Sequence, residues 1–288
     1  MSWMTTRSTR NIGTTTRMNN NQMFQKEMLR LPLLEGCRGI SHFFTTRQGG
    51  VSRGMAFGSM NPGLYTADDP EAVRRNLTIL GERIGLPQER IVMPHQTHED
   101  RLLTIDAAFL AKPEAERRQL LEGVDGLVTA EPRLCVAVST ADCVPLLLYA
   151  PDQGVVAAVH AGWRGTVKGI AQKAVCYLQT QYGCDPAQLR AGIGPSISQA
   201  AFEVGEEVVE AFASAGMPLY RLMRRDPGNG KAHIDLWGAN RWQLMEAGVA
   251  AGHIEIAGIC TYSNWERFFS ARRLGVQSGR IVSGIFNV

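Results

Sequence analysis

The sequence contains no apolar run long enough to cross a membrane and no apolar segment near its start that resembles a signal peptide. A membrane-spanning helix needs about 20 consecutive apolar residues. The longest apolar stretches, Val136–Ala150 and Val155–Ala161, are interrupted or separated by polar residues such as Asp142 and Asp152. We therefore expect a soluble cytoplasmic protein without a membrane partner.

Two cysteine and histidine patterns are also missing. The six cysteines include no Cys-x-x-Cys pair and no short regular spacing, which argues against a disulfide framework and fits a reducing compartment. The six histidines include no His-x-His pair. A multicopper oxidase needs two histidines and a cysteine for its blue copper and a separate histidine cluster for oxygen. One chain of this composition cannot assemble both sites.

Acidic residues are absent from the first 26 positions, which carry three arginines and one lysine. The remaining 26 basic and 27 acidic residues leave the rest of the chain with a net charge of −1. The pI of about 8.6 therefore reflects the N-terminal segment, and the body is not expected to bind nucleic acid. We interpret residues 1–30 as a disordered or over-extended tail and residues 31–288 as a single domain.

Short apolar runs between turn residues predict a mixed sheet. The runs at 134–139, 144–149 and 155–159 are too short for helices and are typical of strands buried on both faces. Further strands are expected at 40–46, 91–93, 127–129, 190–193, 254–259 and 281–286, and helices at 70–85, 165–178, 206–215 and 235–250. No repeat, linker or long amphipathic segment divides the body or indicates an obligate protein partner. The pattern predicts one α+β domain, layered around mixed sheets.

Two histidines and one cysteine stand beside glycines or polar residues at the ends of these strands. His98 ends the segment PHQTH, Cys143 lies in TADCVP, and His160 opens HAGWRGT. Two imidazoles and a thiolate form a ligand set that Zn²⁺ accepts, with a fourth tetrahedral position open as in catalytic sites. Core packing is the usual role of an isolated cysteine or histidine. A third interpretation makes His160 the base that activates Cys143 in a metal-independent cysteine hydrolase.

Several arginines indicate an anion site. Arg47 precedes a glycine-rich turn, and Arg164 lies between Trp163 and Gly165 at the start of an expected helix. Guanidinium and backbone N–H groups at such junctions bind phosphate well. Simple solvation of arginines on polar loops is the alternative, and it is favoured for Arg272, Arg273 and Arg280.

The motifs taken together resemble a known family. They are FTTRQGGVS at 44–52, QTH at 96–98, TADCVP at 140–145, AVHAGWRGT at 158–166, GIGP at 192–195, FEVG at 202–205 and FSARR at 269–273. This order resembles the YfiH-like laccase-domain family over about residues 35–288. Two positions depart from the family pattern: Glu99 stands where glycine is common, and Ser196 where cysteine is common.

The resemblance implies one zinc ion bound by His98, Cys143 and His160, in a fold likened to the cytotoxic-factor cysteine hydrolases. It also implies an enzyme that takes purine nucleosides and phosphate. The expected reactions are phosphorolysis of adenosine and inosine, with guanosine and methylthioadenosine as further candidates, and deamination of adenosine to inosine. Copper-dependent phenol oxidation, which the laccase name suggests, would be incidental chemistry at Cys143.

Within this interpretation, Cys143 is catalytic as a metal ligand and Asp142 is the candidate carboxylate for proton transfer in deamination, with Glu203 second. Orienting a ligand or capping a turn is the alternative role for Asp142. Arg47 is the leading candidate for holding phosphate near C1′ of the ribose, and Arg164 is second, because that attack needs a fixed cation. The cysteine hydrolase and the copper-dependent phenol oxidoreductase remain the alternative functions.

Overall fold

The computed structural model describes residues 28–288. The prediction of an N-terminal tail concerns residues 1–30, so most of it lies outside the described residues.

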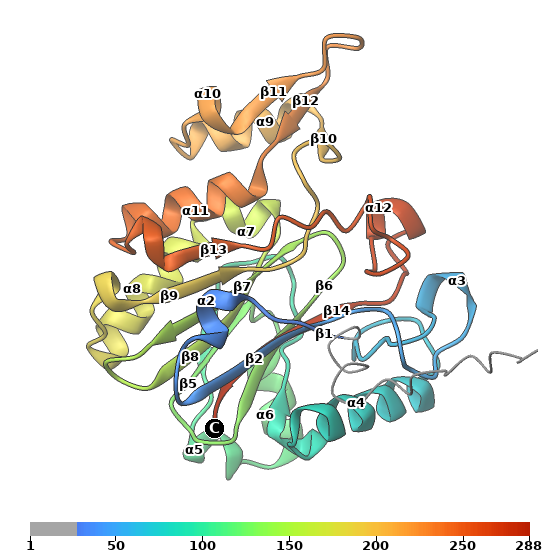
Figure 1. The fold of residues 1–288 in the computed structure, drawn as a ribbon, viewed down its shortest axis with the longest axis vertical. Coiled ribbons are helices and arrows are strands. Elements are labelled where there is room, and N and C mark those ends of the chain that lie inside the picture. The colour runs from blue at the N-terminus through green and yellow to red at the C-terminus, as the bar shows by residue number, and fades with distance from the viewer. Residues whose placement is uncertain (1–27) are drawn as a thin grey trace, which may run out of the picture.

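Two mixed sheets form the middle of the described part (Figure 1). The first has the order β1-β2-β14-β6-β3, with bounds Met28–Leu29, Ile40–Thr45, Ile281–Asn287, Cys135–Thr140 and Ile91–Val92. The second has the order β13-β9-β7-β8-β5-β4, with bounds Ile254–Ile256, Arg190–Ile193, Val144–Ala150, Val155–Ala161, Gly126–Thr129 and Leu102–Thr104.

The two sheets pack face to face because their strands alternate apolar residues between two layers. In β7, Leu147 lies in the cluster between the sheets, whereas Leu146 and Leu148 lie in the cluster on the outer side. Successive side chains of a strand point to opposite faces, so β7 is covered on both sides. All seven of its residues are buried. The predicted doubly buried strands and the layered α/β single domain around mixed sheets are confirmed.

Helices cover the outer faces of both sheets. α4 (Pro70–Ile84) packs Leu77 and Leu80 against Phe43 of the first sheet. α8 (Ile170–Tyr182) and α11 (Leu236–Glu246) cover the second sheet. The remaining helices are short: α2 Pro32–Glu35, α3 Gly54–Phe57, α5 Ala107–Leu110, α6 Glu114–Leu121, α7 Trp163–Val167, α9 Glu206–Ser214, α10 Leu219–Leu222, α12 Ala271–Leu274, and the 3₁₀ turns Gln88–Arg90, Pro186–Gln188 and Ala251–His253.

One predicted helix is divided. The pattern at 165–178 predicts a continuous helix, but α7 ends before Lys168 and α8 begins at Ile170. Gly169 between them has φ of 79°, a left-handed conformation that glycine adopts at little cost and that interrupts a helix.

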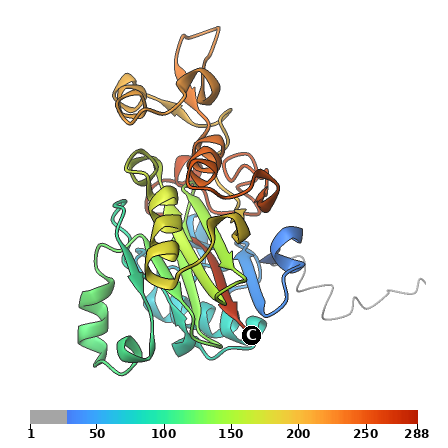
Figure 2. The same cartoon turned by 90° about the vertical axis from the view of Figure 1, so that its left-hand side faces the viewer.

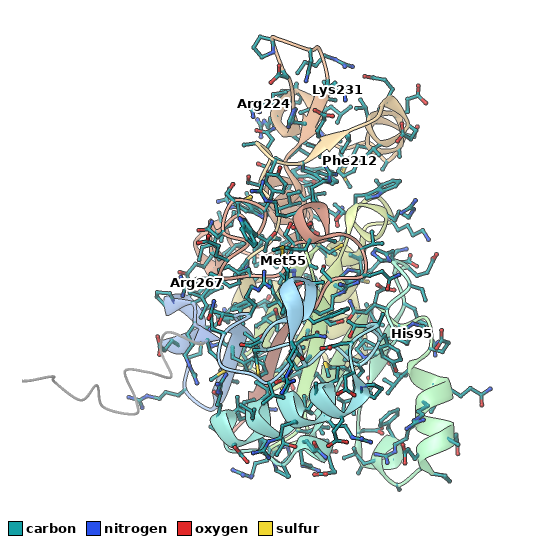
Figure 3. All side chains as sticks on the ribbon, turned by 90° about the vertical axis from the view of Figure 1, so that its right-hand side faces the viewer. Met55, His95, Phe212, Arg224, Lys231 and Arg267 are labelled. Carbon is teal, nitrogen blue, oxygen red and sulfur yellow. The ribbon has the colours of Figure 1, made fainter. Side chains whose placement is uncertain are left out.

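A small third sheet projects beyond the two large ones (Figures 1 and 2). Its order is β10-β12-β11, with bounds Glu203–Val204, Ala232–Ile234 and Met223–Arg225. The loop 226–231 joins β11 to β12; Arg224 in β11 and Lys231 directly before β12 lie beside its two ends (labelled in Figure 3). Among residues 28–288, no helix combines the length and apolarity needed to span a bilayer.

Candidate active site

Three segments bring His98, Cys143 and His160 together. Cys143 directly precedes β7 and His160 is the penultimate residue of β8. The two strands pair antiparallel with Val144 opposite Ala161, so Cys143 and His160 lie at the same edge. The loop after β3 adds His98, and the ligand atoms of the three residues all lie within 4.8 Å of one another.

Two imidazoles and a thiolate form a donor set that a zinc ion accepts. Zn–N bonds of about 2.0–2.1 Å and Zn–S bonds of about 2.3 Å imply ligand atoms roughly 3.3–3.7 Å apart around a tetrahedral ion. Gly162 leaves room for this approach. A Cβ at that position would lie 3.0 Å from Cδ2 of His98 and 3.1 Å from Sγ of Cys143. Glycine therefore allows the ligands to converge where a larger residue would press against two of them.

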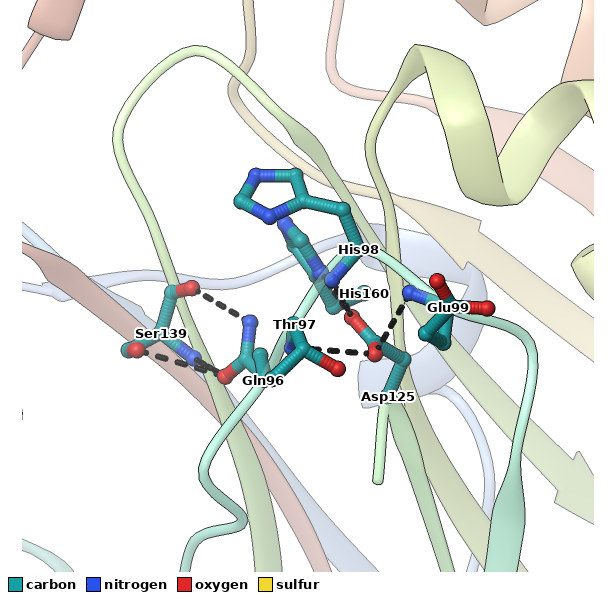
Figure 4. Close-up of polar contacts among 7 residues, drawn as sticks. All are labelled: Gln96, Thr97, His98, Glu99, Asp125, Ser139 and His160. Carbon is teal, nitrogen blue, oxygen red and sulfur yellow. Dashed lines mark hydrogen bonds and ion pairs between the residues drawn. The ribbon is translucent and has the colours of Figure 1, made fainter. Parts of the chain in front are cut away.

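Asp125 is the carboxylate that organises the cluster (Figure 4). It is fully buried, and Nδ1 of His160 lies 2.6 Å from its Oδ1. Its oxygens also accept backbone N–H groups of Thr97 at 3.2 Å, His98 at 3.1 Å and Glu99 at 2.8 Å. Burial alone would raise the pKa of Asp125, but these hydrogen bonds and the His160 charge lower it. The carboxylate thereby fixes one ligand by its ring and another by its backbone.

The loop carrying His98 is held in an uncommon conformation. His98 has φ of 64°, and a positive φ is unusual outside glycine. Besides Asp125, Gln96 holds this loop through its side-chain amide, which donates to the carbonyl of Ser139 and accepts from its N–H, both at 2.8 Å (Figure 4). Glu99, at the position where the family commonly has glycine, forms an ion pair with Lys168. The loop is thus fixed to β6 and to the start of β5.

The cysteine and the buried histidine form a charged pair. Burial raises the pKa of the Cys143 thiol, yet His160 and His98 lower it to about 6. Burial lowers the pKa of His160, yet Cys143 and Asp125 raise it to about 9. Near pH 7 the pair therefore holds one proton, as a thiolate beside an imidazolium.

This protonation predicts proton release on metal binding. A ligand imidazole must be neutral, so at pH 7.5 an added zinc ion should displace about one proton from His160. Below pH 6 Cys143 is also protonated, the number released rises, and zinc affinity falls as the pH falls. Calorimetric titration of zinc in buffers of different ionisation enthalpy measures the number released. A binding enthalpy independent of the buffer at pH 7.5 would contradict the assignment.

The cluster opens into a pocket of about 280 Å³, near the lower end of the ~300–1,000 Å³ typical of small-molecule sites. Arg280 supplies a cationic side chain to this pocket. The lining residues are Tyr65, His95, Gln96, His98, Ser139, Thr140, Ala141, Cys143, His160, Ala271, Val276 and Arg280. Asp125, Tyr65 and His95 were not predicted as site residues from the sequence, and Arg280 was expected to be a solvated arginine. The Asp-Gly step before β5 was the one available signal for Asp125.

The structure places the two predicted carboxylates outside this lining. The Asp142 carboxylate accepts the hydroxyl of Thr261 at 2.6 Å and the N–H of Arg272 at 2.7 Å. Asp142 has φ of 84°, so these bonds fix a strained turn directly before Cys143. Glu203 pairs with Lys231 at 2.7 Å in the projecting sheet. Their proton-transfer roles stay predictions.

The two predicted phosphate ligands also have other contacts. Nε, Nη1 and Nη2 of Arg47 each donate to a main-chain carbonyl, those of Gly58, Trp265 and Met55. Arg47 is buried, with its guanidinium 4.9 Å from the ring centre of Phe269. Arg164 is exposed and lies over its neighbour Trp163 at 4.4 Å. Phosphate binding by Arg47 or Arg164 stays a prediction.

The fold and the pocket define a layered α/β protein with a candidate His–Cys–His metal centre. A sequence model of the family described as multi-copper polyphenol oxidoreductase laccase matches residues 41–287. The chain belongs to this family, as the motifs predicted.

Named relatives and a solved structure agree with this assignment. The chain is 49% identical, over 90% of its length, to a Bacteroides thetaiotaomicron protein named purine nucleoside phosphorylase, of which it covers 96%. It is 43% identical, again over 90% of its length, to adenosine deaminase RL5 of an unknown prokaryotic organism, of which it covers 98%. The crystal structure of the Bacillus licheniformis hypothetical protein YfiH is 32% identical, has a TM-score of 0.83, and aligns with 91% of this chain and 97% of that one.

Proposed function

We propose that this protein is a zinc-dependent enzyme of purine nucleosides that acts in the cytoplasm without an obligate protein partner. Its reactions are phosphorolysis of adenosine and inosine, with guanosine and methylthioadenosine as further candidates, and deamination of adenosine to inosine. The main support for this proposal is that the ligand atoms of His98, Cys143 and His160 lie within 4.8 Å of one another at a pocket. The names of two relatives over 40% identical supply the substrate class.

When bound, the ion supplies a Lewis acid that brings the pKa of water toward ~7, and hence a nucleophile at neutral pH. The chain supplies the orientation. With the ion bound, His160 would be neutral, its Nδ1 would donate to Asp125, and Nε2 would be left as the ligand atom. The hydrogen bonds from Gln96 to Ser139 and from the His98 N–H to Asp125 hold the loop that places His98 beside Cys143 and His160.

Phosphorolysis also needs a fixed cation near the ribose, because phosphate attacks a carbon with developing positive charge. Arg280 lines the pocket, and we add it to Arg47 and Arg164 as a phosphate ligand. Its Nη1 donates to the carbonyls of Ser278 and Gly279, its Nη2 donates to the carbonyl of Val276 at 3.0 Å, and its backbone N–H donates to Oδ1 of Asn61 at 2.9 Å. These bonds hold the guanidinium beside the pocket.

Arginine-to-lysine variants distinguish these assignments. We expect Arg280→Lys to reduce phosphorolysis by about 100-fold, in the range for loss of one charge-stabilising donor, and to leave deamination within a few-fold of wild type. Its melting temperature should also fall, because the guanidinium donates to three main-chain carbonyls that one ammonium cannot serve. Equal losses of both activities in Arg280→Lys would remove Arg280 from phosphate binding. If Arg47 binds phosphate, Arg47→Lys should reduce phosphorolysis far more than deamination, because a fork of donors is replaced by a point charge. Loss of both activities together with a lower melting temperature would instead assign Arg47 to the fold, because one ammonium cannot serve three carbonyls.

The experiment that tests the proposed function is a product assay with adenosine in the presence and absence of phosphate. Inosine and ammonia indicate deamination, and adenine with ribose 1-phosphate indicates phosphorolysis. If the zinc-loaded protein forms neither of these product pairs near neutral pH, the proposal is refuted.

The thiolate–imidazolium pair of Cys143 and His160 favours one second candidate, the metal-independent cysteine hydrolase. Activity that survives complete metal removal would support it. Phenol oxidation has less support: among residues 28–288, which hold all six histidines, His98, Cys143 and His160 make the single group of three or more potential metal ligands.

A further inference from the structure

Two aromatic side chains outside the metal cluster form part of the pocket lining. The rings of Tyr65 and His95 are stacked, with centroids 4.2 Å apart and planes inclined by 26°. Both residues line the pocket that contains His98, Cys143 and His160. Tyr65 is 49% exposed, although a large aromatic side chain is usually better buried. A half-exposed stacked pair beside a reactive centre offers a flat apolar surface to a planar ligand.

His95 is held in position through its ring and its backbone. Its Nδ1 lies 2.7 and 2.8 Å from the two carboxylate oxygens of Glu122. Its backbone N–H donates to the carbonyl of Leu121 and its carbonyl accepts the N–H of Gly123, both at 3.0 Å. These contacts anchor His95 (labelled in Figure 3) to the end of α6. Because Nδ1 faces the Glu122 carboxylate, Nε2 is the ring nitrogen left for other contacts.

The loop that carries Tyr65 is tied to another part of the pocket. Asn61, which is fully buried, donates from Nδ2 to Thr66 at 3.1 Å and to Asp68 at 2.9 Å. Its Oδ1 accepts the backbone N–H of Arg280 at 2.9 Å. The aromatic surface and the cationic residue of the pocket are therefore held in one fixed arrangement.

We propose that the Tyr65–His95 pair is the base-binding wall of the site, against which the purine ring of the nucleoside stacks, and that Glu122 positions His95. This inference rests on the proposed function and names the subsite for one half of its substrate. The metal cluster and Arg280 then serve the reacting atoms and the phosphate, while the aromatic wall recognises the base. Every base has a π face, so stacking favours planar heterocycles in general and leaves their edges to be read by polar groups.

Direct binding of the two halves of the substrate tests the wall. Hypoxanthine and ribose 1-phosphate are titrated separately into zinc-loaded wild type, Tyr65→Ala, Tyr65→Leu and Tyr65→Phe. We expect the alanine and leucine variants to bind hypoxanthine at least about fivefold more weakly, the lower limit for loss of one base–aromatic stack, and to bind ribose 1-phosphate as wild type does. Tyr65→Phe keeps the ring and should bind both normally. Tyr220→Ala, which removes an 81% exposed tyrosine from α10, is the matched control.

The outcomes separate the two proposals. If the alanine and leucine variants bind both ligands equally more weakly, or bind both as wild type does, the base-binding wall is overturned. The proposed nucleoside activity is not affected by either result. Failure of the wild type to bind either ligand, together with no product from inosine and phosphate, would overturn the proposed function as well. Zinc content, measured for each variant, should stay unchanged, because neither aromatic ring belongs to the cluster within 4.8 Å.

The positioning role of Glu122 has its own readout. Glu122→Ala should raise KM for inosine several-fold with little change in kcat, because His95 loses its anchor while the reacting groups keep theirs. Glu122→Gln retains an acceptor for Nδ1 and should restore most of the loss. A fall in kcat with unchanged KM, or no rescue by glutamine, would contradict this role.

Discussion

Replacing Cys143 with alanine is expected to remove the bound metal and the nucleoside activities together. The change leaves two imidazoles, and one negative ligand is lost from a partly buried site. Loss of an outer partner of a metal ligand typically lowers affinity about 10- to 100-fold, and loss of the thiolate ligand itself should exceed that range. Metal analysis of the purified variant should find far less than one zinc ion per chain, and both activities should fall by at least about 100-fold.

Cys176 provides the control for this experiment. It is an exposed free cysteine on α8, so Cys176→Ala should keep its zinc and its activity. Full zinc occupancy in Cys143→Ala would remove Cys143 from the site. Loss of activity with full occupancy would instead favour the cysteine hydrolase.

The second large effect is expected for Asp125→Asn. The carboxylate accepts three backbone N–H groups and the His160 ring, and an asparagine NH₂ must face some of these donors. Each buried donor left without an acceptor costs about 1–3 kcal/mol, so the melting temperature should fall. Zinc affinity should fall by about 10- to 100-fold, because the orientation of His160 and the backbone of His98 both depend on this residue.

Asp106→Asn is a matched control for Asp125→Asn. Asp106 caps α5 by accepting the N–H of Phe109 at 2.7 Å, and asparagine caps helices about as well as aspartate. This variant should keep wild-type zinc affinity and nearly wild-type stability. If Asp125→Asn binds zinc with wild-type affinity, the carboxylate supports only the fold and not the metal site.

The sequence allowed the layered fold to be predicted because its central strands are short, apolar and bounded by turns. It did not predict the third sheet, whose strands have only two or three residues and no clear alternation. It predicted one helix across Gly169, because a helical pattern of apolar residues does not reveal a left-handed glycine. Both failures concern local backbone geometry rather than the layers.

Residue chemistry and the family motifs singled out His98, Cys143 and His160, and the structure brings them together. Asp125 could not be assigned from the sequence, because its partners lie 26 to 35 positions away and an Asp-Gly step usually marks a turn. Tyr65 and His95 escaped notice for the same reason, since a stack between two loops leaves no periodic pattern. Arg47 stands in a family motif, and its buried contacts with carbonyl groups became visible only in three dimensions.

The most direct test of the account is a zinc titration of the metal-free protein, with ribose 1-phosphate formation from inosine and phosphate as the measurement. The account predicts that the rate rises linearly with added zinc and reaches a plateau at about one ion per chain, in proportion to occupancy of the His98–Cys143–His160 site. A rate that is already maximal in the metal-free protein, or that stays at zero when the site is filled, would contradict it.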